Sequence, residues 1–222
     1  MSIEVFDYRS DGPRGLNFFV TPGCRARFLT IRPKEAAPFH HHQLGQEVFV
    51  VMEGRGLFVI GDDEPVLVAG EACVARSDER HFVGPADENP VTLFLCVTPH
   101  IQPTHVLFDE SGKQLADDYR SLFMPKSEPS AMLRPESDEE LAGLQIQALE
   151  DLATLTEAAA RAARVKVIEM GRMLADGDGA AAAEARDSMW VSLAPVFESA
   201  MAAADIWNSL TARTVGAPLA ES

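Results

Sequence analysis

The chain has 222 residues, of which 46% are hydrophobic and 24% are charged, as is typical of a globular protein with a core of useful size. Its formal net charge is -15. This acidic excess repels phosphate backbones and anionic lipid, so we expect neither nucleic-acid nor membrane binding.

The N-terminal stretch MSIEVFDYRSDGPRG has early acidic residues and no long apolar core, so it does not predict a signal peptide. No uncharged apolar run approaches the length that spans a membrane. Three widely spaced cysteines without a CxxC pair argue against a disulfide scaffold and for a reducing compartment. We therefore expect a cytoplasmic protein.

Residues 16–108 carry the pattern of an all-β domain. Short runs of Val, Ile, Leu and Phe alternate with turn signals such as EGRG and GDDE, and no helical period interrupts them. This predicts an antiparallel sandwich or barrel, to which we assign residues 1–110. The predicted strands are NFFVT, CRARFLTI, EVFVVM, GLFVIG, PVLVAG, EACVA and VTLFLCVT.

The second half of the chain changes character. A polar, proline-broken stretch over 111–136 predicts a linker or surface wrap, and residues 137–215 predict two helices separated by ADGDG. Ser137 and Glu140 form a capping box, and Pro195 should kink or split the second helix. The predicted apolar faces are Leu141, Leu144, Ala148, Leu152, Leu155, Ala159 and Ala162, then Met189, Leu193, Val196, Phe197, Ala200, Ala204, Trp207 and Leu210.

The first helix would span about 37 residues, or about 55 Å, which is longer than a small barrel. Its alanine-rich faces permit close helix approach, so we expect an antiparallel hairpin that is a candidate dimerisation element, and a homodimer. The predicted fold class is α+β, an antiparallel β-barrel followed by a C-terminal helical hairpin.

The stretch PFHHHQLGQEVFVVMEGRG places three of the six histidines in a row. On a strand, His40 and His42 face one side and His41 faces the other. A bend before Glu47 would turn its carboxylate toward the two imidazoles, and such a set suits a divalent transition metal. A histidine pair alone also fits structural or surface histidines.

The spacing of these residues favours a metal site over structural or surface histidines. His40, His42, Glu47 and Gly54 have the spacing of the first motif of the cupin superfamily, in its His-x-His form, and the stretch resembles that motif in full. This resemblance implies a jelly-roll barrel with a metal inside its mouth, over about residues 15–110 of the chain.

A second cupin motif is met in part by GEACVARSDERHFVGP. Gly70 and His81 occupy the family's first glycine and histidine positions. The proline position holds Arg76, the inner glycine position holds Asp78, and the asparagine position holds Pro85. The Ser-Asp dipeptide before Glu79 can still form the tight turn that this motif requires.

The resemblance implies His40, His42, Glu47 and His81 as the ligands of one divalent transition metal. Fe(II) is favoured, and Mn(II), Zn(II), Ni(II) and Cu(II) remain open. Three imidazoles and one carboxylate leave free positions on a five- or six-coordinate ion, which a catalytic site needs and a structural site lacks.

Residues near this motif are candidates for binding a substrate. If Glu47 faces the interior, strand alternation places Phe49 and Val51 there as an apolar wall. Arg25 and Arg27 share a strand face and either clamp a substrate carboxylate or snorkel at the barrel surface.

Two more histidines, His100 and His105, follow the last long strand among prolines. They are candidates for a general acid or base, or surface residues without a role.

These features predict a metal-dependent enzyme acting on a small organic molecule, with a dioxygenase-type oxidation as the leading reaction. A non-redox isomerase, lyase or cyclase would use the same ligands as a Lewis-acid site. A regulatory protein that binds a small ligand, or a structural protein with an inert barrel, would also fit the sequence. The absence of a basic helix-turn-helix argues against a DNA-binding regulator.

Overall fold

The computed structural model describes residues 3–9, 16–102, 105–109, 111–114 and 133–214. Most of the predicted linker over 111–136 therefore lies outside the described residues.

The chain divides into two compact units. The barrel unit comprises Met1–Leu133 with Thr211–Ser222, and the hairpin unit comprises Arg134–Leu210. No helix of the described residues is long and apolar enough to cross a membrane.

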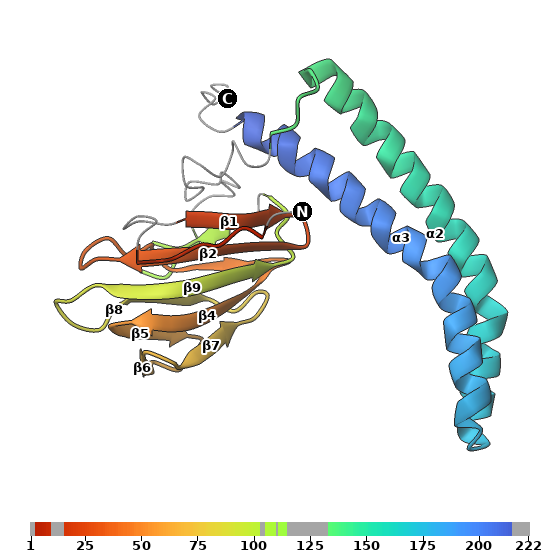
Figure 1. Ribbon diagram of the computed structural model, residues 1–222, viewed down its shortest axis with the longest axis horizontal. Helices are drawn as coiled ribbons and strands as arrows, with labels where there is room; N and C mark the ends of the chain where they lie inside the picture. Colours follow the sequence, from red (N-terminus) through yellow and green to blue (C-terminus); the bar gives the residue numbers. More distant parts are fainter. Residues whose placement is uncertain (1–2, 10–15, 103–104, 110, 115–132, 215–222) are drawn as a thin grey trace. The chain divides into compact units, whose positions relative to one another are not determined.

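The described part of the barrel unit consists of strands that form two five-stranded antiparallel sheets (Figure 1). The strands are β1 (Leu16–Thr21), β2 (Cys24–Ile31), β3 (His40–His42), β4 (Gln46–Glu53), β5 (Arg55–Ile60), β6 (Val66–Val68), β7 (Ala72–Ala75), β8 (His81–Pro85), β9 (Val91–Thr98) and β10 (His105–Leu107). One sheet has the order β1-β2-β9-β4-β7 and the other has the order β10-β3-β8-β5-β6. The predicted antiparallel β-barrel is confirmed.

The registers of the first sheet arrange its inward residues in rows. Glu47 pairs with Val97 and Ala75, and Val97 pairs with Arg25 on its other side. Directly paired residues of antiparallel strands point to the same face. Arg25 and Glu47 therefore lie in one inward row, which we call the Glu47 row.

The next inward row lies two residues further along each strand, or about 7 Å away. Arg27 pairs with Leu95, Leu95 pairs with Phe49, and Phe49 pairs with Cys73. We call this the Phe49 row. Arg25 and Arg27 therefore share a face, as predicted, but belong to different rows.

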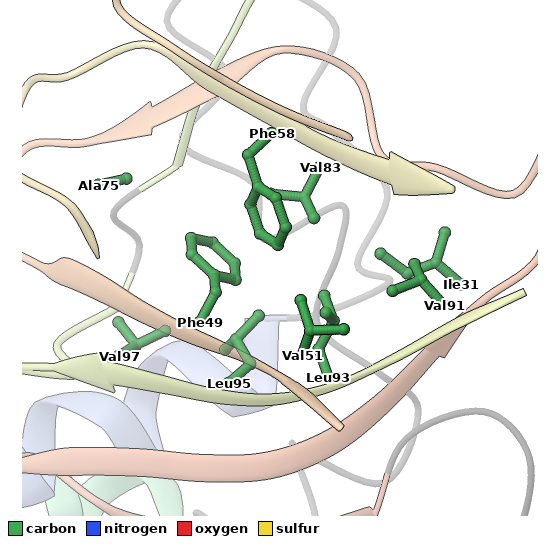
Figure 2. Close-up of a cluster of buried hydrophobic side chains, with 10 residues drawn as sticks. All are labelled: Ile31, Phe49, Val51, Phe58, Ala75, Val83, Val91, Leu93, Leu95 and Val97. Atoms are coloured by element: carbon green, nitrogen blue, oxygen red, sulfur yellow. The ribbon is translucent and has the colours of Figure 1, made fainter. Parts of the chain in front are cut away.

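The inward residues of both sheets form the core of the barrel unit. Phe49 and Phe58 contact each other across the sheets, with ring centroids 5.6 Å apart, and both are buried (Figure 2). Burial of this apolar area is the main term that holds the sheets together. The buried cluster comprises Ile31, Phe49, Val51, Phe58, Ala75, Val83, Val91, Leu93, Leu95 and Val97.

The outer face of the first sheet is also apolar in part. Phe18, Phe28 and Phe94 come from β1, β2 and β9, and Phe18 and Phe28 lie 5.1 Å apart between ring centroids. Phe6 and Tyr8 of the N-terminal segment contact this group. Because both faces carry apolar residues, β2 and β9 show no clean polar alternation.

Two strands of the second sheet were not predicted. β8 contains Gly84 and Pro85, which are poor strand formers, and β10 has only three residues between the proline-broken 99–104 stretch and Phe108. Their main-chain pairing with β5 and β3 stabilises them. A long-range pairing of this kind leaves no local signal.

The hairpin unit contains α2 (Asp138–Ala175) and α3 (Gly179–Thr214). The capping box is present, because Ser137 accepts from the Glu140 amide and Glu140 accepts from the Ser137 amide. At the other end, Gly177 has a φ of 78°, which the absence of a Cβ permits. The ADGDG stretch is thus a helix–helix turn.

Side chains at two places connect the helices. Near the turn, Lys166 of α2 donates to the Ser188 hydroxyl of α3. At the open end, Arg134 donates through its amide to Ser209 and through its guanidinium to Asp205. The helices are therefore antiparallel partners, as predicted.

The details of the hairpin differ from expectation. Pro195 does not split α3, which continues through it. Phe197 and Trp207 were placed on the apolar face of α3, but they are 56% and 43% exposed. Leu144 of α2 is exposed as well, whereas Leu141 is fully buried. Most of the buried apolar residues of the hairpin are small, such as Ala159, Ala182 and Ala203, although Leu141, Met189 and Ile206 are buried as well.

Candidate metal centre

Four residues from three strands meet at one end of the barrel interior. His40 and His42 come from β3, Glu47 from the start of β4 and His81 from the start of β8. One ligand atom from each lies within 4.8 Å of the other three. The cluster is the group that the two motifs specified.

Strand alternation separates the three consecutive histidines. His40 pairs with His81 across β3 and β8, and their ring centroids are 4.4 Å apart. The ring of His42 is 5.7 Å from that of His81. His41 points away, where its Nδ1 donates to the Asp78 carbonyl at 3.2 Å. His41 is therefore outside the cluster, as predicted.

Two turns hold these strands in place. Gly54, the glycine of the first motif, has a φ of 80°, and a Cβ there would lie 2.4 Å from the Pro90 carbonyl oxygen. In the second motif Asp78 stands at the inner glycine position with a φ of 61°, a conformation that Asp tolerates. The Asp78 amide donates to the His42 carbonyl at 2.8 Å, which connects the turn to β3.

Main-chain carbonyls orient two of the imidazoles. Nδ1 of His40 donates to the Pro38 carbonyl at 2.9 Å, and Nδ1 of His81 donates to the Glu79 carbonyl at 2.8 Å. In both cases the acceptor is two residues earlier in the chain. These bonds leave Nε2 of each ring for the cluster, as in protein sites where an outer hydrogen bond fixes the ligating nitrogen.

Glu47 is the acceptor at the centre of the cluster. Its Oε2 lies 3.1 Å from Nε2 of His81, and its Oε1 lies 3.2 Å from Nε2 of His42 and 3.8 Å from Nη2 of Arg25. Burial alone would raise the pKa of Glu47, but the charge and hydrogen bonds of His42 and His81 hold it well below its ordinary value. The carboxylate is therefore ionised.

His81 is an imidazolium in this structure, since both of its nitrogens donate to groups that only accept. Burial lowers the pKa of His81, but the hydrogen bond to Glu47 and the charge of that carboxylate outweigh it and raise the pKa. His40 differs, because burial and the charge of His81 lower its pKa to about 3. His40 is neutral at pH 7.

The cluster fits a divalent transition metal. Ligand atoms on one such ion lie at most about 4.4 Å apart, so small side-chain movements close the cluster around it. Imidazole and carboxylate donors suit Fe, Mn, Ni, Cu and Zn alike, and the donor set does not choose among them. On binding, the Nε2 proton of His81 must leave.

A cavity of about 260 Å³ adjoins the cluster. His40 and Glu47 face it, together with the polar residues Arg27, Thr30, Glu35 and His105. Its apolar walls are Leu29, Ile31, Ala37, Phe49, Val83, Leu93 and Leu95. The cavity therefore combines several polar groups with mostly apolar walls, as small-molecule sites do.

The predicted substrate-binding residues have different positions. Phe49 and Arg27 line the cavity, while Val51 is buried in the core cluster next to it. Arg25 is only 2% exposed, so it does not snorkel at the surface. Sequence reasoning missed Leu29 and Ile31, although both follow from extending the inward alternation of Arg25 and Arg27 along β2.

The two candidate acid–base histidines are both buried and not on the surface. His105 pairs with His42 across β10 and β3, its ring lies 4.3 Å from that of His42, and it lines the cavity. The described lining residues do not include His100, whose amide donates to the Pro22 carbonyl at 2.8 Å.

Comparison with known proteins agrees with this geometry. A family model described as the cupin domain matches residues 27–98. No curated protein matches the chain.

Solved structures align with about half of the chain. TT1209 from Thermus thermophilus is 21% identical over 45% of this chain and 98% of its own, with a TM-score of 0.39. A double-stranded β-helix protein from Klebsiella pneumoniae is 19% identical over 44% and 91%, with a TM-score of 0.38. The Cnp3 cupin domain of Schizosaccharomyces pombe is 9% identical over 43% and 69%, with a TM-score of 0.41. The family match therefore assigns residues 27–98 to a cupin domain, in agreement with the two motifs and the paired sheets.

Proposed function

We propose that this protein is a metal-dependent enzyme that acts on a small organic molecule inside the cupin barrel. The observation that carries the proposal is the joint position of three imidazoles and one carboxylate beside a mostly apolar cavity. Four protein ligands leave coordination positions open on a five- or six-coordinate ion.

Within this class, we favour a dioxygenase-type oxidation with Fe(II), in which both atoms of O₂ enter the product. A bound Fe(II) would supply the redox chemistry that allows O₂ to react with an organic molecule. The walls formed by Leu29, Phe49 and Leu95 exclude bulk water and hold the apolar body of the substrate.

We favour His105 as the acid–base residue, because it lines the cavity beside His42. Burial and the neighbouring rings of His42 and His40 hold the pKa of His105 well below its ordinary value. The ring is therefore held in its neutral form, the form in which a nitrogen is able to accept a proton from a substrate. A His105→Gln variant should keep its metal and lose turnover.

Metal analysis of protein purified without chelator tests the proposal. We expect one transition-metal ion per chain, lost in His40→Ala and in His81→Ala. His41→Ala is the matched control, because it removes a neighbouring imidazole that lies outside the cluster. Protein that folds normally and takes up no metal on titration would exclude the proposed enzyme.

The reaction is identified by oxygen uptake. Fe(II)-loaded protein would be screened against small diketones, phenols and hydroxy acids while O₂ consumption is recorded. Product formation without O₂ consumption would instead assign a non-redox isomerase, lyase or cyclase to the same site.

A further inference from the structure

Two arginines of β2 face the barrel interior, but the structure separates their surroundings. Arg25 lies in the Glu47 row, is 2% exposed, and places Nη2 3.8 Å from Oε1 of Glu47. Arg25 therefore places a positive charge next to the carboxylate of Glu47. Arg27 lies one row further along, in the Phe49 row, and lines the cavity.

Among the described lining residues, Arg27 is the one whose side chain is a permanent cation. Arg27 therefore offers an anionic ligand a fixed positive charge among walls that are mostly apolar.

A guanidinium beside an apolar cavity selects its ligand by charge and by shape. The planar fork of Arg donates two parallel hydrogen bonds to a carboxylate, and such charge-assisted bonds are about twice as strong as neutral ones. The volume of about 260 Å³ admits a ligand smaller than drug-sized molecules.

We propose that the substrate is a small organic acid whose carboxylate binds Arg27, with its apolar body against Leu29, Phe49 and Leu95 and its reacting end toward the ligand cluster. This inference rests on the proposed function for the reaction, but the binding step does not require turnover. Arg27 is the specificity-determining residue.

Calorimetric titration with matched acids and amides tests the assignment. The probes are 3-methylbutanoate and benzoate, each compared with its neutral amide, in metal-free and in metal-loaded protein. We expect the wild type to prefer each acid over its amide by at least about tenfold. Arg27→Gln should remove this preference, and Arg27→Lys should keep part of it, because it retains the charge without the fork.

Arg55→Gln is the control, since it removes an exposed arginine of the barrel unit that is not among the described lining residues. Far-ultraviolet circular dichroism and thermal unfolding verify that each variant folds. If Arg27→Gln does not fold, nuclear Overhauser effects between bound benzoate and the Leu29 or Leu95 methyl groups in the wild type decide the position.

An acid preference that persists in folded Arg27→Gln, an equal affinity for acids and amides in the wild type, or benzoate bound away from these methyl groups would each overturn the assignment. The proposed enzyme can fail separately. Wild type that binds no metal but prefers acids through Arg27 would refute the enzyme and keep the acid site. Turnover of neutral compounds without acid preference would do the reverse.

Discussion

The two units of this chain differ in which unusual side chains they bury or expose. The barrel unit encloses Arg25, His42, Glu47 and His81, each at most 3% exposed. The hairpin unit instead exposes large apolar groups, with Val191 74% and Trp190 57% exposed. Buried charge costs stability and exposed apolar area costs solubility. We therefore interpret the buried charged residues of the barrel as a site for a ligand, and the exposed apolar residues of the hairpin as a surface for a partner.

The largest expected effect would come from removing the central charge of the barrel. Glu47→Gln keeps the shape but leaves Arg25 and the His81 imidazolium without their counter-charge, which should cost about 3–5 kcal/mol of unfolding free energy. Metal binding should be lost as well. Denaturant titration and metal analysis measure these effects, with the exposed Glu88→Gln as control.

Truncation of one aromatic residue in each unit tests whether the barrel residue is buried and the hairpin residue is exposed. Phe58 is fully buried, so Phe58→Ala should destabilise the barrel by about 3–5 kcal/mol. Trp190→Ala should change the unfolding free energy of a monomer by less than about 1 kcal/mol, as for other exposed sites. Equilibrium unfolding checks both values. An equal loss of unfolding free energy in Phe58→Ala and Trp190→Ala would contradict this difference between the two units.

The exposed apolar surface of the hairpin is the candidate interface of the homodimer that the sequence predicts. If it forms, replacing Trp190 with Glu should weaken association by about 2 kcal/mol or more, because large aromatic residues dominate such interfaces. Light scattering coupled to size exclusion measures the mass per particle as a function of concentration. A wild type that is monomeric at every concentration would rule out this role.

The protonation state of His81 predicts how metal affinity depends on pH. Its pKa is raised, so below that pKa one proton must leave for each ion bound, whereas His40 is already neutral above about pH 3. The affinity should therefore fall about tenfold, or about 1.4 kcal/mol, per unit of decreasing pH below the raised pKa, and level off above it. Calorimetry in buffers of different ionisation enthalpy counts the protons. Buffer-independent heats would refute the imidazolium.

The smallest expected effect concerns the helix cap. Ser137→Ala removes the acceptor for the Glu140 amide and should cost about 1 kcal/mol of helix stability. Amide hydrogen exchange in the first turn of α2 reports it locally, without a change in the barrel. Unchanged protection in that turn would show that the packing of Leu141 determines the helix start.

Much of the barrel was predictable because its motif fixes local geometry. His40 and His42 share a face by alternation, and Gly54 and Asp78 occupy turns that need a left-handed residue. The contact of His105 with His42 depends on β10 pairing with β3 across more than sixty residues, so its neighbours were not predictable. Arg25 lies beside Glu47 and Arg27 lies beside Phe49 because of the register of β2 with β9 and of β9 with β4, which the sequence does not reveal.

In the hairpin, the helices were predictable from the sequence but the buried faces were not. Composition and the capping box predicted both helices, because helical periodicity is local. The predicted apolar faces included Phe197 and Trp207, which are exposed, because a helix rich in alanine offers several faces of similar hydrophobicity. Pro195 lies inside α3 and does not end it.

The two-sided hydrogen bonding of His81 has a consequence for electroneutrality. In this structure Arg25 and the Nε2 proton of His81 both lie beside the carboxylate of Glu47. Exchange of the His81 proton for a divalent cation would raise the net charge of the barrel interior by only one unit, because a proton leaves as the ion enters. A monoanionic ligand in the adjoining cavity then restores the original charge, so a cycle of loading and binding ends with the barrel no more charged than it began.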